Sequence, residues 1–354
     1  MTEWAERLAS WSPPSEWRRV LAVDAHTEGE PLRVILSGFP ELKGDSIPEI
    51  RRVARANHDG LRRALMWEPR GHADMYGCIV LPPATPEADL GVLFTHNAGF
   101  STMCGHGIIG VTTVLLECGL LDVVAPVTSV GIDTPAGFVR AEAHIADWGG
   151  DRGQRVDRVS FLNVPSFAAR LDERVDVPGV GPVRYDLAYG GAFYAYVNAA
   201  EFGFQLIPEE TDRLIDLGRR IKIAVQTTAP PVHPDSPDLS FLYGTIFVGD
   251  ARDVGGHSRN VCVFADGEVD RSPTGTGVSG RLALHHARGE VADGQEIVIE
   301  SILGTRFTGR VVGSGRVGDH AAVLPEVTGR AYVTGRNEIL MNPMDPLSEG
   351  FLLR

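Results

Sequence analysis

The chain has 354 residues, of which 43% are hydrophobic, and its 46 acidic and 33 basic side chains give a net charge of -13. At roughly 150 residues per domain, this length suffices for two domains with sizeable cores. The negative charge disfavours nucleic acid as a partner, because phosphates repel an acidic surface. No stretch approaches the ~20 consecutive apolar residues of a membrane-spanning helix, so a membrane protein is not expected.

The N-terminal segment carries Glu3, Glu6 and Glu16 and lacks a long apolar run. It resembles neither a secretory signal nor an arginine-rich transit peptide, and we expect a cytoplasmic protein. The same segment holds three of the five tryptophans. We expect it to pack back on the body of the protein, with a partner-docking segment as the alternative.

Short strand-like segments bounded by glycine, proline or aspartate dominate the sequence. They are predicted at residues 18–23, 32–36, 76–81, 91–95, 156–161, 193–197, 241–248, 260–264 and 296–300. Helices are predicted at residues 48–65 and 209–224 and after each of two glycine-rich motifs. Many strands with few helices predict a mixed α/β fold that is rich in strands.

The two glycine-rich motifs belong to an internal repeat with an offset of 170 residues. Residues 92–119 align without a gap with residues 262–289, which places Cys104-Gly105-His106-Gly107 on Thr274-Gly275-Thr276-Gly277. Each copy is predicted as a strand, a loop, the motif, a helix and a final glycine. This pattern indicates a duplicated protein made of two similar halves.

We expect the first half to span residues 18–180 and to carry Cys104, and the second to span residues 181–334 and to carry Thr274. C-terminal strands within residues 335–354 are expected to pack back on the first half.

Each motif precedes an apolar run with helical spacing, so each should lie at a helix N-terminus. The free N–H groups and the dipole of a helix N-terminus favour a bound anion such as a carboxylate. A thiolate is also favoured there, which would suit Cys104 as a base or nucleophile. The alternative is that Cys104 is buried and inert. Cys78, Cys118 and Cys262 are expected to be core residues.

Five ordered motifs resemble the proline racemase family. They are Asp24-Ala25-His26-Thr27-Glu28-Gly29-Glu30-Pro31, Glu68-Pro69-Arg70-Gly71-His72, Met103-Cys104-Gly105-His106-Gly107, Tyr189-Gly190-Gly191-Ala192-Phe193-Tyr194 and Asp270-Arg271-Ser272-Pro273-Thr274-Gly275-Thr276-Gly277. The resemblance implies a diaminopimelate-epimerase-like fold of two pseudo-symmetric halves, each a strand-rich, barrel-like sheet around a central helix.

Racemases and epimerases of this family carry a cysteine in both motifs, one for each face of the substrate. Here Thr274 replaces the second cysteine, and an unactivated hydroxyl is a poor base or acid for a carbon acid. The Cys/Thr pair resembles the trans-3-hydroxy-L-proline dehydratases of the family. The implied reaction is removal of the α-proton by Cys104 and loss of the 3-hydroxyl as water, giving 1-pyrroline-2-carboxylate.

The resemblance also implies roles in binding a small imino acid. The backbone N–H groups of Gly105 and His106 on one side, and of Gly275 and Thr276 on the other, would hold its carboxylate. Asp270 would bind the ring ammonium, although a role as a turn cap is the alternative. The group that protonates the leaving hydroxyl is left open between Cys104 and His106.

The sequence predicts no metal and no organic cofactor. The spacings of His26, His72, His96 and His106 match no common metal-ligand pattern, and the glycine motifs lack the third glycine of a dinucleotide site. Three other functions stay open: a racemase or epimerase with a different second base, a non-catalytic imino-acid-binding protein, and a cysteine hydrolase. The choice between a monomer and a homodimer also stays open.

Overall fold

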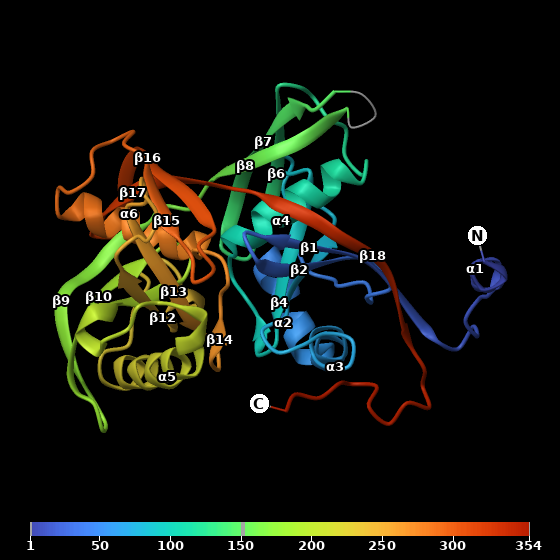
Figure 1. Ribbon diagram of the computed structural model, residues 1–354, viewed down its shortest axis with the longest axis horizontal. Helices are drawn as coiled ribbons and strands as arrows, with labels where there is room; N and C mark the ends of the chain where they lie inside the picture. Colours follow the sequence, from blue (N-terminus) through green and yellow to red (C-terminus); the bar gives the residue numbers. More distant parts are fainter. Residues whose placement is uncertain (1, 150–152, 354) are drawn as a thin grey trace.

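The computed structural model describes residues 2–149 and 153–353, and it consists of two bodies that lie side by side (Figure 1). The first repeat contains β1 (Arg18–Thr27), β2 (Glu30–Ser37), α2 (Ile47–Asn57), α3 (Asp59–Met66), β3 (Tyr76–Leu81), β4 (Leu90–His96), β5 (Gly99–Phe100), α4 (Gly105–Glu117), β6 (Val127–Thr134), β7 (Gly137–Asp147), β8 (Gln154–Leu162) and β9 (Phe167–Val177). The second contains β10 (Gly181–Tyr189), β11 (Phe193–Asn198), α5 (Thr211–Thr228), β12 (Leu242–Gly249), β13 (Ser258–Phe264), β14 (Glu268–Val269), α6 (Gly275–Ala287), β15 (Ile297–Glu300), β16 (Arg306–Val317), β17 (His320–Gly329) and β18 (Ala331–Met341).

The strand pairings of the two bodies follow one pattern. In the first body the order is β18-β1-β2-β3-β4-β6-β7-β8, with β2/β3 and β4/β6 parallel. In the second it is β9-β10-β11-β12-β13-β15-β16-β17, with β11/β12 and β13/β15 parallel. Antiparallel pairing of β8 with β17 joins the bodies. The two bodies therefore have the same topology.

The last strand of each repeat crosses to the other body. β9 pairs with β10, and β18 pairs with β1 from Arg18/Met341 to Thr27/Ala331. In Figure 1 the red strand β18 runs from one body across to the other. The C-terminal tail follows it, because Phe351 bridges to Glu68. We propose residue 180 as the boundary between the repeats, with crossing strands that begin at Phe167 and Ala331.

A central helix lies inside each curled sheet. α4 is apolar and buried from Gly105 to Leu116, and it contacts strands at both ends of the first body's order, β18 and β8. α6 is buried from Gly275 to Leu284 and likewise contacts β9 and β17. A sheet whose two ends both touch one helix is curled around that helix. The predicted fold class, two pseudo-symmetric halves each wrapped on a central helix, is confirmed.

Two local expectations are wrong. The helix predicted over residues 48–65 is two helices, α2 and α3, because His58 leaves the helical region with φ -131° and ψ 17°. The N-terminal segment does not pack back as a whole: α1 (Glu3–Ser10) contains no buried residue, and Trp4 is 76% exposed. Figure 1 shows this helix at the right, away from both bodies. Among the described residues, no helix is long and apolar enough to cross a membrane.

Candidate active site

A small cavity of about 20 Å³ lies between the two bodies. The first body lines it with Tyr76, Met103, Cys104, Gly105 and His106. The second lines it with Tyr194, Tyr243, Cys262, Phe264, Asp270, Thr274, Gly275 and Thr276. All seven site residues expected from the sequence are therefore brought together around one cavity.

The N-termini of the two central helices meet at this cavity. A Cβ atom added to Gly105 would lie 2.6 Å from Cα of Gly275, and one added to Gly275 would lie 2.7 Å from Cα of Gly105. Only residues without a side chain allow this approach. Both helix dipoles thus direct partial positive charge to one point, where the first-turn N–H groups have no partner within the helix.

Cys104 is the N-cap of α4, and its Sγ atom accepts a hydrogen bond from the N–H of Gly107 at 3.2 Å. The Nδ1 atom of His106 lies 3.1 Å from Sγ. Burial raises the pKa of the Cys104 thiol well above its usual value, while the Gly107 N–H opposes this in smaller measure. Burial therefore opposes the preference for a thiolate that the helix N-terminus was expected to give.

Thr274 occupies the matching N-cap of α6 with a different backbone. Its φ is 66°, and its side chain makes no cap hydrogen bond. A β-branched residue rarely adopts a positive φ, and such strain persists where the surrounding structure enforces it, often at active sites. Its buried Oγ1 atom makes no hydrogen bond of good geometry within the described part of the chain, but the side chain interacts with the carboxyl of Asp270 and the thiol of Cys262. Thr274 also lines the cavity, so its hydroxyl can bond to a molecule there.

Asp270 lies in the loop before α6 and is 5% exposed. Its Oδ1 atom accepts hydrogen bonds from the N–H and the hydroxyl of Ser272, at 2.8 and 2.7 Å. Burial raises the pKa of this carboxyl to about 6. Asp270 therefore caps a turn, which was one of the two roles expected from the sequence. It also lines the cavity, which the other expected role, binding of the ring ammonium, requires.

Comparisons with known proteins agree with this architecture. A family model described as proline racemase matches residues 22–352. The chain belongs to the proline racemase family. A protein of Colwellia psychrerythraea named trans-3-hydroxy-L-proline dehydratase is 47% identical over 353 residues, 99% of this chain and 98% of the relative. One of Burkholderia cenocepacia with the same name is 46% identical over 337 residues, 95% of this chain and 99% of the relative.

Epimerases are also among the similar proteins. A protein of Burkholderia multivorans named 3-hydroxyproline 2-epimerase is 45% identical over 337 residues, 95% of this chain and 99% of the relative. The solved structure of a hydroxyproline epimerase from Agrobacterium vitis, with bound trans-4-hydroxy-L-proline, has a TM-score of 0.87 at 34% identity and covers 95% of this chain and 96% of that chain.

In this member of the proline racemase family, a buried carboxylate of the first body holds the loop that carries Asp270. Glu30 of β2 is fully buried, and its Oε2 atom accepts a hydrogen bond from the N–H of Arg271 at 2.7 Å. The guanidinium of Arg271 also lies 3.6 Å from the carboxylate of Asp74. These contacts tie the second body's Asp270 loop to the first body. Glu30 lay in a family motif, but the sequence alone did not indicate this contact.

The cavity also includes residues that sequence analysis did not assign to the site. Tyr194 bonds through its hydroxyl to Oγ1 of Thr276 at 2.8 Å. Cys262 was expected to be a core residue, and it is buried, but it also lines the cavity. Tyr76 and Tyr243 come from β3 and β12, far along the chain from the glycine motifs. Strand periodicity predicts only that such residues are buried.

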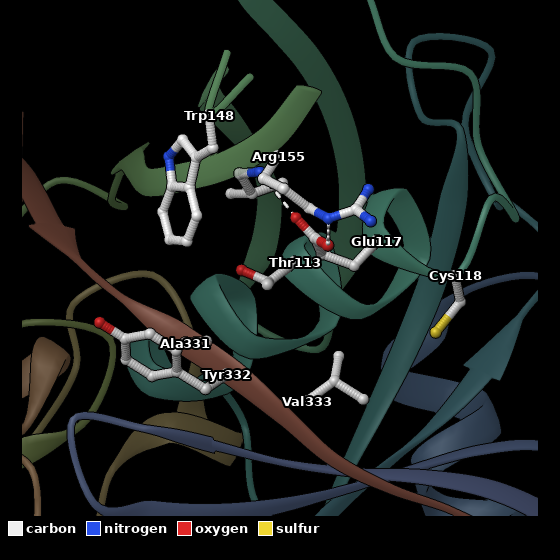
Figure 2. Close-up of a pocket in the computed structure, with 9 residues that line it drawn as sticks. Thr113, Glu117, Cys118, Trp148, Arg155, Ala331, Tyr332 and Val333 are labelled. Atoms are coloured by element: carbon white, nitrogen blue, oxygen red, sulfur yellow. Dashed lines mark hydrogen bonds and ion pairs between the residues drawn. The ribbon is translucent and has the colours of Figure 1, made fainter. Parts of the chain in front are cut away.

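A second hollow lies at the other end of α4 (Figure 2). Its lining includes Thr113, Glu117 and Cys118 at the C-terminal end of the helix and the partly exposed Trp148 and Tyr332. At 1.5 Å per residue, the helix separates this hollow from Cys104 by roughly 20 Å. Its charged pair, Arg155 and Glu117, is mutually compensated at 3.5 Å. It is therefore separate from the candidate active site.

Proposed function

We propose that the protein is a trans-3-hydroxy-L-proline dehydratase, a hydro-lyase that converts its substrate to 1-pyrroline-2-carboxylate. One observation carries the proposal: the two helix N-caps that meet at the cavity present one thiol, Cys104, and one hydroxyl, Thr274. A racemase that works on both faces of a carbon acid needs an effective base and acid on opposite sides. The dehydratase names of relatives at 46–47% identity support the same reaction.

The substrate's carboxylate would bind at the junction of the two helices. The backbone N–H groups of Gly105, His106, Gly275 and Thr276 lie in the first turns of α4 and α6 and line the cavity. They would also stabilise the negative charge that spreads onto the carboxylate as the α-proton leaves. Asp270 would pair with the ring ammonium, whose positive charge favours the ionised form of this carboxyl.

The reaction needs one basic group on one face of the ring. In trans-3-hydroxy-L-proline the 3-hydroxyl lies on the same face as the α-hydrogen, so the elimination is syn. Cys104, as the thiolate, would take the α-proton, and the 3-hydroxyl would leave as water from the same side. Thr274, which lines the cavity from the second body, would hydrogen-bond to the substrate from the other face through its Oγ1 atom. The initial product then tautomerises to 1-pyrroline-2-carboxylate.

Epimerisation of a 3-hydroxyproline is the second candidate function. The thiol of Cys262 lines the cavity from the body that carries Thr274, so it could supply a second acid on that side. Burial raises the pKa of this thiol well above its usual value. A protonated thiol could donate to the α-carbon with inversion. One relative carries the epimerase name.

The deciding experiment is an assay of the purified protein on the hydroxyproline stereoisomers. We expect 1-pyrroline-2-carboxylate from trans-3-hydroxy-L-proline and no product of D configuration. Cys104→Ser should keep the fold, because the change is nearly isosteric, but lower turnover by orders of magnitude, because an alcohol is far less acidic than a thiol. A D-configured product without the pyrroline would identify an epimerase, and turnover of Cys104→Ser within about tenfold of wild type would remove Cys104 from the mechanism.

We place this enzyme in the cytoplasm. The described cysteines are all free, and a reducing compartment keeps a catalytic thiol available. A homodimer is the assembly that we propose, and the elution volume of the purified protein on a calibrated column tests it.

A further inference from the structure

The syn geometry restricts the group that protonates the departing hydroxyl. This inference rests on the proposed function. The 3-hydroxyl and the α-hydrogen lie on the same face of the ring, so the acid that protonates the hydroxyl must lie on the same side of the substrate as Cys104. The first body lines the cavity with three side chains that carry a dissociable proton, Tyr76, Cys104 and His106. The choice is therefore among these three residues.

His106 is poorly suited to this role. Its side chain is 3% exposed, and burial lowers its pKa to about 3. Near neutral pH the ring is therefore uncharged, and a neutral imidazole is a weak acid. Its Nδ1 atom faces the thiol of Cys104 at 3.1 Å, which orients that thiol.

Tyr76 is held against the reacting thiol by rings on two sides. Its ring meets His106 edge to face, with centroids 4.6 Å apart, and stacks on His96 at 5.7 Å with 19° between the planes. His96 is itself fixed, because its Nδ1 atom lies 3.2 Å from Oε1 of Glu268. A ring clamped in this way has little rotamer freedom left, so the position of its hydroxyl is defined.

The phenol is also in the protonation state that an acid requires. Burial raises the pKa of Tyr76 well above its usual value, so the O–H stays intact at neutral pH. Tyr76 interacts with the thiol of Cys104, and this contact favours the thiolate. One side chain thus carries a proton on the Cys104 face and lies within reach of the group that receives the α-proton.

We propose that Tyr76 is the general acid that protonates the departing 3-hydroxyl. The Cys104 thiolate takes the α-proton, and the C–H electron pair forms the C2–C3 double bond as the C3–O bond breaks. The proton of the Tyr76 hydroxyl moves to the leaving oxygen, which departs as water. The new thiol proton of Cys104 then passes to the tyrosinate, and this restores both residues for the next turnover.

The test compares two leaving groups on the variant Tyr76→Phe, which loses only the hydroxyl. Elimination from trans-3-hydroxy-L-proline should fall about a hundredfold or more, the usual contribution of a general acid. Chloride leaves without a proton, so release of chloride from trans-3-chloro-L-proline should fall only as far as the lost contact with the Cys104 thiol slows removal of the α-proton, and the ratio of water loss to chloride loss should drop at least tenfold. A purely structural role of Tyr76 would lower both rates together.

Tyr185→Phe is the matched control, because Tyr185 is another buried tyrosine but lies in β10 of the second body and does not line the cavity. Its ratio of water loss to chloride loss should equal that of wild type. If Tyr76→Phe keeps the wild-type ratio, the proton comes from Cys104 or His106 and the assignment of Tyr76 is wrong. If wild-type enzyme forms no pyrroline product from the hydroxyl substrate, the proposed function itself fails.

Discussion

We expect residue 274 to determine which face of the ring can exchange a proton. In the variant Thr274→Cys, a second thiol would face Cys104 across the cavity. With trans-4-hydroxy-L-proline, which lacks the 3-hydroxyl, we expect this variant in deuterated water to incorporate deuterium at the α-carbon with inversion. We expect a low rate, because the surroundings of residue 274 are not adapted to lower the pKa of a thiol.

Thr274→Ser is the control for this experiment, because it keeps a hydroxyl and adds no thiol. It should show no inversion, as should the wild type. Inversion by the wild type would show that another group already supplies a proton to that face. Cys262 would be the first residue to test, because it lines the cavity from the second body.

Asp270 should make substrate binding depend on pH. Its pKa of about 6 means that the carboxyl loses its charge as the pH falls through that value. The affinity for L-proline, measured by calorimetric titration, should therefore fall below about pH 6. Asp270→Asn should weaken binding at neutral pH by about 1.5–3 kcal/mol, the range for a charged hydrogen bond, and should abolish this pH dependence.

Ser272→Ala tests the same pH dependence with a smaller change, because it keeps the carboxyl of Asp270 and removes one of its hydrogen bonds. The hydroxyl of Ser272 donates to Oδ1 of Asp270 at 2.7 Å and so stabilises the charged carboxylate. Its removal should raise the pKa of Asp270 and move the loss of proline affinity to higher pH. An unchanged pH profile in both variants would show that Asp270 only caps its turn.

At the level of the elements, the junction of α4 and α6 depends on two glycines. Gly105→Ala places a Cβ atom 2.6 Å from Cα of Gly275, so the helix ends must separate. We expect the free energy of unfolding to fall by about 1–3 kcal/mol, as for other overpacked sites, and activity to fall more steeply because the N–H groups move apart. Denaturant unfolding and an activity assay would measure the two effects.

Gly315→Ala is a suitable control for this substitution. Gly315 lies in β16, and a Cβ atom added there would meet no atom within 4 Å. We expect its stability to lie within about 0.5 kcal/mol of wild type. Equal stability and activity of Gly105→Ala and Gly315→Ala would show that the helix junction tolerates a wider separation.

Several of the elements that sequence analysis recognised are continuous apolar runs that are buried along their whole length. β4 and β13 are buried at every position, and both were predicted as strands. The two helices after the glycine motifs were also predicted. C-terminal strands were expected within residues 335–354, whereas β18 begins at Ala331; its start could not be located because most of its residues are exposed or half-buried. Its place in the structure comes from pairing with β1, some 310 residues away.

For the whole molecule, the exchange of β9 and β18 should make the two bodies unfold together. Each sheet contains a strand whose chain belongs to the other repeat, and β8 and β17 pair directly. We expect one calorimetric transition, with the calorimetric enthalpy equal to the van't Hoff value.

Two core substitutions make this prediction sharper. Ile108 in α4 and Leu282 in α6 are both fully buried. Replacement of either by alanine should cost about 2–5 kcal/mol and lower the midpoint of the same single transition. Two resolved peaks, with each substitution shifting only one of them, would show that the bodies are independent.

The resemblance to the proline racemase family implied the seven residues expected around the site, while the sequence by itself determined the duplication and the two central helices. These follow from local signals, since a glycine motif before an apolar run defines a helix start wherever the chain goes. Only the tertiary structure decided how closely the two helix ends approach, that β9 pairs with β10 of the second body, and that Tyr76 and Cys262 join the cavity. The burial of Cys104, which opposes the effect of the helix N-terminus on its thiol, likewise depends on residues from the whole chain.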